Sequence, residues 1–346
     1  MKIEWKTDTE LVISDSMKKN KVAGIAMSLI SNGEVIHSDT YGVINTMTRE
    51  PVQHDTKFEA ASLTKPLFSY LVMRLCDKKF INLNTPVFEY LPEYEISCDL
   101  RYKIITPENI LCHSSGIEDW SPKPLNIYFE PGSKFLYSGE AYTYLQKAVE
   151  NVMGRDLGQL AEGEIFKPLQ MNNSTLSWTH AVNNHLSYTF DSQGRMEQKR
   201  THSGFSVCTE PNAACTLYTT IDDYTKFILN IIDNKNISLS SASFNNMIDA
   251  HNKISENLFW GLGWGIYRKE NKLIWHWGDN GSFKSFVCLD LNTKSGVLIF
   301  TNSFNGLNVC YDIAGNVAAE NFNPIREFVA HAEDPTGETV LPDHSS

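Results

Sequence analysis

The sequence lacks any paired arrangement of its cysteines. They number seven, an odd count, and no two stand in a C-x-x-C motif. Disulfide-stapled domains and structural zinc sites both depend on regularly spaced cysteines, so we expect neither in this chain. We interpret the cysteines as reduced thiols, most of them in the core: Cys76, Cys98, Cys112, Cys208, Cys215, Cys288 and Cys310.

Positive charge and long apolar runs are also scarce. Lysine and arginine total 30 against 41 aspartates and glutamates, which gives a net charge of −11. Nothing in this balance favours binding to phosphate backbones, so we expect no nucleic-acid partner. The longest apolar stretch, residues 22–30, is far shorter than the roughly 20 residues that span a bilayer, so we expect no membrane insertion.

The start of the chain has no positively charged segment followed by an apolar one. We therefore expect the chain as given to be cytoplasmic. If it is the mature form of a longer precursor, it would instead be periplasmic or secreted.

Several catalytic signatures are missing, and each absence removes a class of mechanism. The sequence has no G-x-S-x-G elbow, no H-E-x-x-H and no G-x-x-x-x-G-K. The glycines within residues 261–265 are wrongly spaced for a dinucleotide loop, so we interpret this run as a strand where backbones pack closely. The ten histidines show no ligand spacing, so we expect no metal and no cofactor.

Length and composition are those of a globular enzyme. The chain has 346 residues, 42% hydrophobic and 21% charged, enough for about two domains. Five apolar runs separated by turn residues predict one antiparallel sheet: residues 22–30, 34–37, 273–277, 283–291 and 296–301. Between them the apolar residues recur with helical periodicity, so the middle of the chain is predicted to be helical.

This order of elements predicts an α/β (α+β) fold with a discontinuous sheet domain. We assign residues 1–61 and 220–332 to the sheet domain and residues 62–219 to a mostly helical domain. The polar residues 333–346 are predicted to form a flexible tail.

The strongest candidate for chemistry is the S-x-x-K motif at Ser62 and Lys65. Ser62 directly precedes a strong helical pattern, so it should lie at a helix N-terminus with Lys65 beside it on the same face. The positive end of the helix would favour negative charge developing there. By itself the motif is also explained by a serine that only caps the helix. A second copy at Ser16 and Lys19 lacks this context, and we interpret it as accidental.

Two later segments carry a resemblance to a known family. Tyr137-Ser138-Gly139 precedes a predicted helix, and His276-Trp277-Gly278 lies on a predicted strand. With Ser62 and Lys65, and in the same order, they resemble the S-x-x-K, Y-x-N and K-T-G or H-x-G elements of the serine β-lactamase and penicillin-binding family, in its class C-like branch. Runs at 105–116, 167–171 and 260–264 extend the resemblance over roughly residues 10–320.

The resemblance implies the β-lactamase-like fold and a catalytic arrangement. Ser62 would be the nucleophile, and either Lys65 or Tyr137 would accept its proton. His276 would face the substrate, where it polarises a carboxylate or carbonyl or relays a proton. The backbone N–H groups of Ser62 and Asp279 would hold the oxyanion. The remaining expected substrate contacts are Gly139, Trp277 and Gly278.

Other residues near these motifs receive structural interpretations. The acidic pairs Glu118-Asp119 and Asp222-Asp223 are interpreted as helix-start or solvated acids, not as a glycosidase dyad. Several aromatic residues could line an acyl pocket, but aromatic side chains in such positions are more often core: Trp120, Tyr128, Phe129, Trp260 and Trp264.

Two departures from the family pattern bear on the substrate. Gly139 stands where many relatives have an asparagine that contacts the substrate amide, and His276 replaces the lysine of true β-lactamases. Efficient penicillin hydrolysis is therefore not expected.

We expect a serine hydrolase that cleaves an ester, an amide or a D-amino-acid peptide, like a D-alanyl-D-alanine carboxypeptidase or a β-lactamase. One alternative is a carboxylesterase acting on small acyl esters. The other, of a different class, is a weakly catalytic penicillin-binding or sensor domain that is acylated and holds the acyl group.

Overall fold

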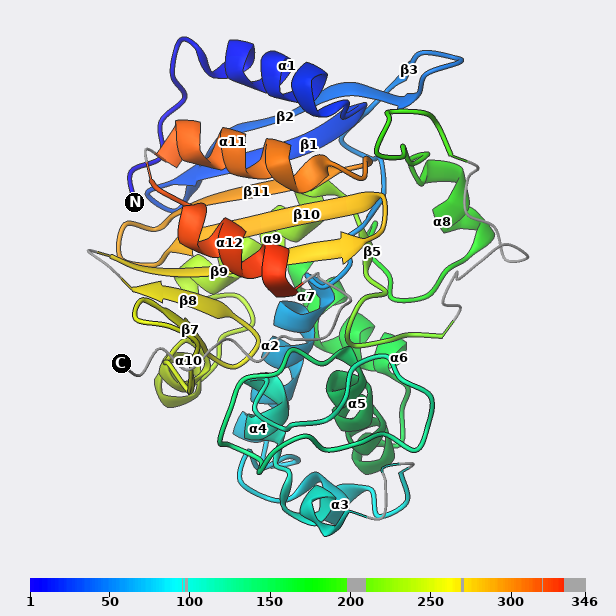
Figure 1. Cartoon of the computed structure of the whole chain (residues 1–346), viewed down its shortest axis with the longest axis vertical. Coiled ribbons are helices and arrows are strands. Elements are labelled where there is room, and N and C mark those ends of the chain that lie inside the picture. The colour runs from blue at the N-terminus through cyan, green and yellow to red at the C-terminus, as the bar shows by residue number, and fades with distance from the viewer. Residues whose placement is uncertain (95, 97–98, 198–209, 269–270, 319, 333–346) are drawn as a thin grey trace. The chain divides into compact units, whose positions relative to one another are not determined.

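The computed structural model describes residues 1–94, 96, 99–197, 210–268, 271–318 and 320–332 (Figure 1). Contacts divide the chain into two units. The first unit comprises residues 1–67, 156–238 and 271–322, and the second comprises residues 68–155, 239–270 and the chain from 323 onward. The division differs from the expected domains. Residues 62–67 and 156–219 fall in the unit that contains the sheet, and residues 239–270 and 323–332 fall in the other unit. The expected tail, residues 333–346, lies outside the described residues.

An antiparallel sheet forms the centre of the first unit, with strands in the order β3-β2-β1-β11-β10-β9. The five strands predicted from the sequence are all present, and their antiparallel pairing is confirmed. The strands are β1 (Gly24–Ser31), β2 (Glu34–Asn45), β3 (Glu50–Pro51), β9 (Lys272–Asn280), β10 (Phe283–Asp290) and β11 (Ser295–Thr301).

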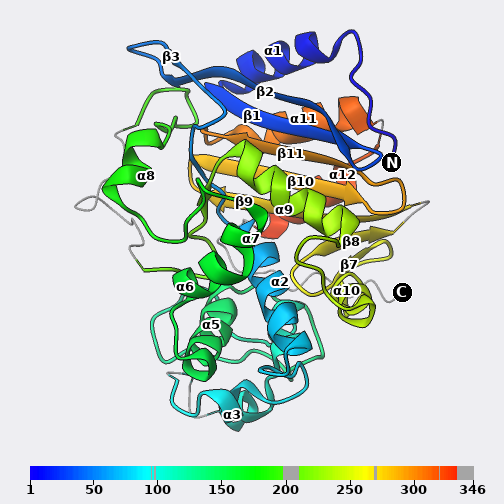
Figure 2. The ribbon, with the colours of Figure 1, turned by 180° about the vertical axis from the view of Figure 1, so that it is seen from behind.

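Helices of the first unit cover both faces of this sheet. Figure 1 shows α1 (Thr9–Asn20) and α11 (Gly306–Ala318) over one face, and Figure 2 shows α9 (Ile221–Asp233) over the other. Every residue of β10 and β11 is buried, as expected for strands packed on two sides. The helix α9 is capped by Thr220, whose side chain accepts a hydrogen bond from the Asp223 N–H.

Short elements complete the first unit. They are β4 (Phe58–Glu59), β5 (Tyr218–Thr219), α6 (Leu157–Ala161), a π-helical turn (Glu162–Phe166), α7 (Lys167–Leu169) and α8 (His180–His185). The strands β4 and β5 pair with each other and bring the chain to the start of α2 (Thr64–Asp77).

The second unit is largely helical. Its long helix α5 (Gly139–Met153) is capped by Ser138, whose side chain accepts a hydrogen bond from the Ala141 N–H. Gly154, with φ +61°, caps the other end. Its described elements also include α3 (Val87–Tyr90), a 3₁₀ helix (Leu100–Ile104), α4 (Pro107–Leu111), α5 (Gly139–Met153), α10 (Ser241–Met247), α12 (Asn323–Ala332), β6 (Asn252–Lys253), β7 (Leu258–Trp260) and β8 (Gly265–Arg268).

The strand predicted over residues 261–265 is wrong for most of that run. Residues 261–264 form the turn between β7 and β8, and only Gly265 is in a strand. The close packing inferred there is nevertheless present. A Cβ at Gly261 would lie 2.8 Å from the carbonyl oxygens of Met247 and Asp249. Glycine therefore marks a close backbone approach here, and a turn permits that approach as well as a strand does.

The cysteines that the structure describes are free thiols: Cys76, Cys112, Cys215, Cys288 and Cys310. Cys98 and Cys208 lie outside the described residues. Within the described ranges, none of the helices combines the length and the apolar character needed to cross a bilayer.

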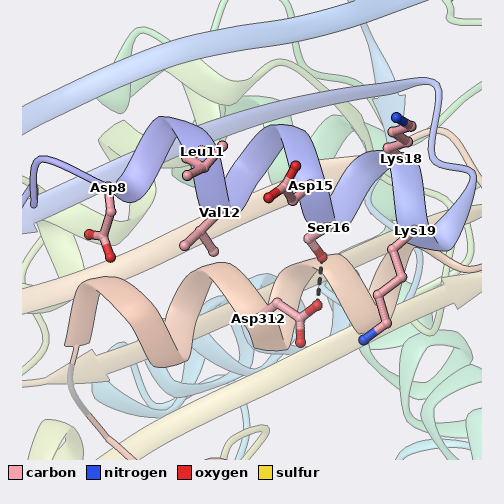
Figure 3. Close-up of a pocket in the computed structure, with 8 residues that line it drawn as sticks. All are labelled: Asp8, Leu11, Val12, Asp15, Ser16, Lys18, Lys19 and Asp312. Carbon is pink, nitrogen blue, oxygen red and sulfur yellow. Dashed lines mark hydrogen bonds between the residues drawn. The ribbon is translucent and has the colours of Figure 1, made fainter.

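An open groove of about 780 Å³ runs between α1 and α11 (Figure 3). None of the candidate catalytic residues lines it. It contains the second S-x-x-K copy, and there the Ser16 hydroxyl donates a 2.6 Å hydrogen bond to Asp312 on the neighbouring helix. Ser16 therefore has a structural partner, in agreement with its interpretation as an accidental match.

Replacing Ser16 by alanine should lower stability and leave activity unchanged. Ser16→Ala removes the donor from a partly buried carboxylate, which should cost about 1 to 2 kcal/mol of unfolding free energy. Urea denaturation measures this loss, and hydrolysis assays under native conditions measure the activity. A loss of hydrolysis in the folded variant would mean that the second motif takes part in the chemistry.

Candidate active site

The candidate nucleophile lies in a strained turn directly before α2. The Ala60 N–H donates to the Leu217 carbonyl at 2.8 Å, which ends the pairing of β4 with β5. The next residue, Ala61, has φ +52°, a conformation that is uncommon outside glycine. Such outliers persist only where the surrounding structure enforces them, and they gather at functional sites. The turn leaves Ser62 half-buried, within reach of solvent.

Hydrogen bonds from two directions hold this turn. The Thr64 hydroxyl donates to the Ala61 carbonyl at 2.6 Å and accepts from the Leu217 N–H at 3.0 Å. On the other side, the Tyr224 hydroxyl of α9 donates to the Leu63 carbonyl at 2.9 Å. The backbone on both sides of Ser62 is thereby fixed, so its hydroxyl is presented from a rigid frame.

Lys65 lies beside Ser62, as the i, i+3 spacing predicts. Its Nζ is 3.1 Å from Ser62 Oγ and 3.0 Å from the carbonyl oxygen of Ala214, and the residue is 1% exposed. An ammonium group donates to both oxygens at these distances. A neutral amine at the same position could instead accept the hydroxyl proton, which is the geometry that an activated serine requires.

Strand β9 packs directly against the chain that leads to Ser62. A Cβ at Gly278 would lie 2.4 Å from the Ala60 carbonyl oxygen and 2.2 Å from Ser285 Oγ, so only glycine fits. Ser285, which pairs with Gly278 across β9 and β10, donates its hydroxyl to the same Ala60 carbonyl at 2.9 Å. The K-T-G-like segment and the nucleophile turn are therefore neighbours within the first unit.

Asp279 follows Gly278, and its carboxylate has partners of its own. The carboxylate accepts from the Gly281 N–H at 2.7 Å and forms an ion pair with Lys284. The N–H of Ser62, the other expected oxyanion donor, donates no hydrogen bond to another backbone group within the described part of the chain. The oxyanion role of these two N–H groups stays a prediction.

His276 is fully buried, and its ring orientation is fixed. Its Nδ1 lies 2.7 Å from the Trp277 carbonyl oxygen, which can only accept, so Nδ1 carries the proton and Nε2 of the neutral ring is the acceptor. Burial, and to a smaller extent the positive charge of Lys65, lower the pKa of His276 to about 3, although the hydrogen bond to Trp277 acts in the opposite direction. His276 is therefore neutral at neutral pH and has no positive charge to offer a substrate carboxylate.

Trp277 is engaged by the protein itself. It is 3% exposed, and its ring centroid lies 6.0 Å from that of Trp275 and 5.4 Å from that of His276. Its visible contribution is the carbonyl group that orients His276. The expected contact between Trp277 and a substrate stays a prediction.

Tyr137 belongs to the second unit, where His113 supports it. The two rings stack with centroids 4.2 Å apart, and Trp260 meets Tyr137 edge-on at 6.0 Å. His113 Nδ1 also accepts the N–H of Ser138, the cap of α5, at 3.2 Å. His113 lies in the family-like run 105–116, and no pattern in the neighbouring sequence indicates its contact with Tyr137.

Gly139, also in the second unit, faces an aromatic ring. An added Cβ would lie 2.3 Å from Cζ2 of Trp120. A larger side chain at this position would therefore require the Trp120 ring to move.

Two of the aromatic residues interpreted as core are exposed. Trp120 is 56% exposed and Tyr128 is 59% exposed, so the interpretation of these two residues as core is wrong. Trp260 and Trp264, by contrast, are fully buried, and their interpretation as core is confirmed.

The expected site residues are thus divided between the two units. Ser62, Lys65 and residues 276–279 lie in the first unit, and Tyr137 and Gly139 lie in the second. Across the described ranges, no three His, Cys, Asp or Glu side chains are grouped so as to hold a metal ion.

Comparison with known proteins gives a consistent result. The family model described as Beta-lactamase matches residues 10–318. Protein flp of Staphylococcus aureus strain MW2 is 25% identical over 313 residues, which is 85% of this chain and 62% of that protein. The chain thus spans less than two thirds of the length of this relative.

Solved structures share the fold. The octameric penicillin-binding protein homologue from Pyrococcus abyssi superposes with a TM-score of 0.78 at 22% identity, covering 94% of this chain and 82% of that one. The D-alanine carboxypeptidase AmpC from Burkholderia cenocepacia gives a TM-score of 0.72 at 18% identity, covering 89% and 99%. The predicted combination of an antiparallel sheet with flanking helices is confirmed.

The lowered pKa of His276 predicts a pH dependence of stability. The unfolded chain binds a proton on this histidine below about pH 6.5, whereas the folded chain stays unprotonated down to about pH 3. The stability that the neutral ring contributes is therefore complete above pH 6.5 and is lost as the pH falls. Between about pH 6.5 and 5 the wild type should lose about 1.5 kcal/mol more than His276→Asn, whose amide can still donate to Trp277.

Urea denaturation at several pH values measures this difference. Every other titratable group is common to both proteins, so their contributions cancel. Parallel pH profiles for the two proteins would contradict the low pKa of His276.

Proposed function

The chain belongs to the β-lactamase family, and we propose that it is a serine hydrolase that cleaves an ester or amide through an acyl-Ser62 intermediate. The observation that carries this proposal is the contact between Lys65 Nζ and Ser62 Oγ at 3.1 Å, with Lys65 almost fully buried. Serine hydroxyls are weak nucleophiles alone, and a base within hydrogen-bond distance is what activates them. The fixed turn around Ser62 supports the same role.

In the proposed reaction, Ser62 Oγ attacks the carbonyl carbon of the substrate while its proton passes to a base. The new C–O bond forms as the carbonyl electron pair moves to the oxygen, where the N–H groups of Ser62 and Asp279 would stabilise the charge. The tetrahedral intermediate then expels the alcohol or amine, which takes up a proton. Water attacks the acyl-enzyme in the same manner, and this releases the acid and restores Ser62.

Two residues are candidates for the base. Lys65 is supported by its distance to the hydroxyl, and Tyr137 is supported by the resemblance of Tyr137-Ser138-Gly139 to the family's tyrosine element. His113 would act as a positioning residue for Tyr137 through the stacked rings. Neutral His276, with Nε2 as an acceptor, suits the relay of a proton better than the binding of a carboxylate.

The neutral His276 also bears on the substrate. D-alanyl-D-alanine peptides end in a carboxylate, and the family's lysine would offer that group a positive charge, whereas His276 does not. This observation favours the second candidate function, a carboxylesterase acting on small uncharged acyl esters. The first candidate is an activity like that of a D-alanyl-D-alanine carboxypeptidase or a β-lactamase, and the carboxylesterase is the alternative to it.

Removing the nucleophile should abolish turnover. Ser62→Ala is expected to reduce kcat for p-nitrophenyl acetate about a thousandfold or more, because it removes the hydroxyl that forms the acyl-enzyme. Ser16→Ala, from the second S-x-x-K copy, is the matched control and should keep wild-type rates. Equal rates in wild type and Ser62→Ala would refute the proposal and return Ser62 to the role of a helix cap.

Substrate comparison then separates the candidate activities. Release of nitrophenol from neutral esters should exceed release of D-alanine from an acylated D-alanyl-D-alanine peptide at equal enzyme concentration. Faster cleavage of the peptide would instead favour the carboxypeptidase. A stable fluorescent-penicillin adduct on Ser62, without turnover of any substrate, would identify a sensor domain.

A further inference from the structure

Asn280 ends strand β9, and its side chain joins this strand to two other segments of the first unit. The amide nitrogen donates to the Glu59 carboxylate at 2.8 Å and to the Cys215 carbonyl oxygen at 3.2 Å. A backbone carbonyl can only accept, so the nitrogen of the amide, not its oxygen, faces these two groups. The side chain that makes these contacts directly follows Asp279, whose N–H is an expected oxyanion donor.

The two segments that accept from Asn280 also carry the nucleophile and its lysine. Glu59 lies in β4, three residues before Ser62. Cys215 directly follows the residue whose carbonyl oxygen lies 3.0 Å from Lys65 Nζ. One amide therefore connects the strand of the expected oxyanion donor to the chain that presents the hydroxyl and to the chain that holds the base.

The burial of Glu59 makes this connection costly to break. Glu59 is 5% exposed, and its backbone pairs with Tyr218 of β5. A buried carboxyl group that loses a donor is destabilised more than an exposed one, because water cannot replace the donor. Hydrogen bonds to a carboxylate are also about twice as strong as those between neutral groups. The end of β9 is therefore held firmly against β4.

A second set of contacts holds the same end of β9 through Asp279. Its carboxylate accepts from the Gly281 N–H at 2.7 Å and forms an ion pair with Lys284, its register partner on β10. Lys284 is 5% exposed, and its Nζ lies 5.0 Å from the centroid of the Phe304 ring. Neighbouring side chains of a strand point to opposite faces, so Asp279 and Asn280 hold the strand from both sides. The N–H of Asp279 is thereby fixed between two anchors.

We propose that Asn280 is a positioning residue that fixes the N–H of Asp279 relative to Ser62, so that both expected donors meet one oxyanion. This inference rests on the proposed hydrolase function and adds a residue that determines its rate. Removing one oxyanion donor costs about a hundredfold to a thousandfold in kcat, and displacing a group by about 1 Å can cost about a hundredfold. An amide that ties the donor strand to the nucleophile turn therefore controls the rate while acting only through its neighbour.

Removal of this amide should slow hydrolysis without weakening the binding of the ester. Asn280→Ala is expected to lower kcat for p-nitrophenyl acetate about thirtyfold with little change in KM, because the oxyanion forms in both acylation and deacylation. Phenylboronic acid adds to a serine hydroxyl as a tetrahedral anion, so it should bind the variant about thirtyfold more weakly, as a transition-state analogue does. Wild-type kcat and boronate affinity in the folded variant would overturn the inference.

Asn305→Ala is the matched control. The Asn305 amide is also half-buried and also joins two segments of the first unit, donating to the carbonyl oxygens of Asn20 and Ser192 at 3.0 Å each. Urea denaturation should show a loss of stability in both variants, whereas only Asn280→Ala should lose activity. An equal loss of activity in Asn305→Ala would identify general destabilisation as the cause and would overturn the positioning role.

Exchange of the donor and the acceptor tests the contact itself. Asn280→Asp places two carboxylates against each other and should be at least as slow as Asn280→Ala. Glu59→Gln/Asn280→Asp restores a donor on the other side and should be about tenfold faster than Asn280→Asp alone. The recovery is partial because a carboxylate offers the Cys215 carbonyl no hydrogen. Equal rates in these two variants would overturn the link to Glu59.

The two proposals fail in different ways. Full activity in Ser62→Ala would refute the proposed function, and the role of Asn280 would fall with it. Inactive Ser62→Ala together with wild-type rates in Asn280→Ala would overturn only the role of Asn280.

Discussion

The proposed chemistry depends on one short contact, the 3.1 Å approach of Lys65 Nζ to Ser62 Oγ. Long lysine side chains usually lie in solvent, so burial at 1% exposure has to be compensated by fixed partners. The Ala214 carbonyl provides one, and the strained turn at Ala61 aims the serine at the lysine. The packing of Gly278 against Ala60 then brings β9 beside the same turn. If the turn relaxed, the base and the strand would both lose their relation to the nucleophile.

The burial of this site also determines the charge of His276. Because its ring is fully buried and the positive charge of Lys65 lies nearby, His276 stays neutral and directs its Nδ1 proton to the Trp277 carbonyl. A neutral imidazole offers no positive charge to a substrate carboxylate.

The sequence predicted what depends on local spacing. The i, i+3 relation of Ser62 and Lys65 and the five sheet strands follow from neighbours along the chain. The contact of Trp120 with Gly139 joins residues 19 positions apart through a tertiary fold, and no local pattern encodes it. The prediction of a strand over residues 261–265 is wrong because close packing favours glycine in turns as much as in strands. The low pKa of His276 likewise results from its burial in the folded protein, which the neighbouring sequence does not indicate.

The most direct test of the account is the location of the covalent acyl group. The protein is treated with a fluorophosphonate reagent for activated serines and digested with trypsin, and the modified peptide is sequenced by tandem mass spectrometry. The added mass should lie in the peptide of residues 58–74 and, within it, on Ser62 and not on Ser69. A modification on any other serine, or none in the folded protein, would contradict the assignment of Ser62 as the activated nucleophile.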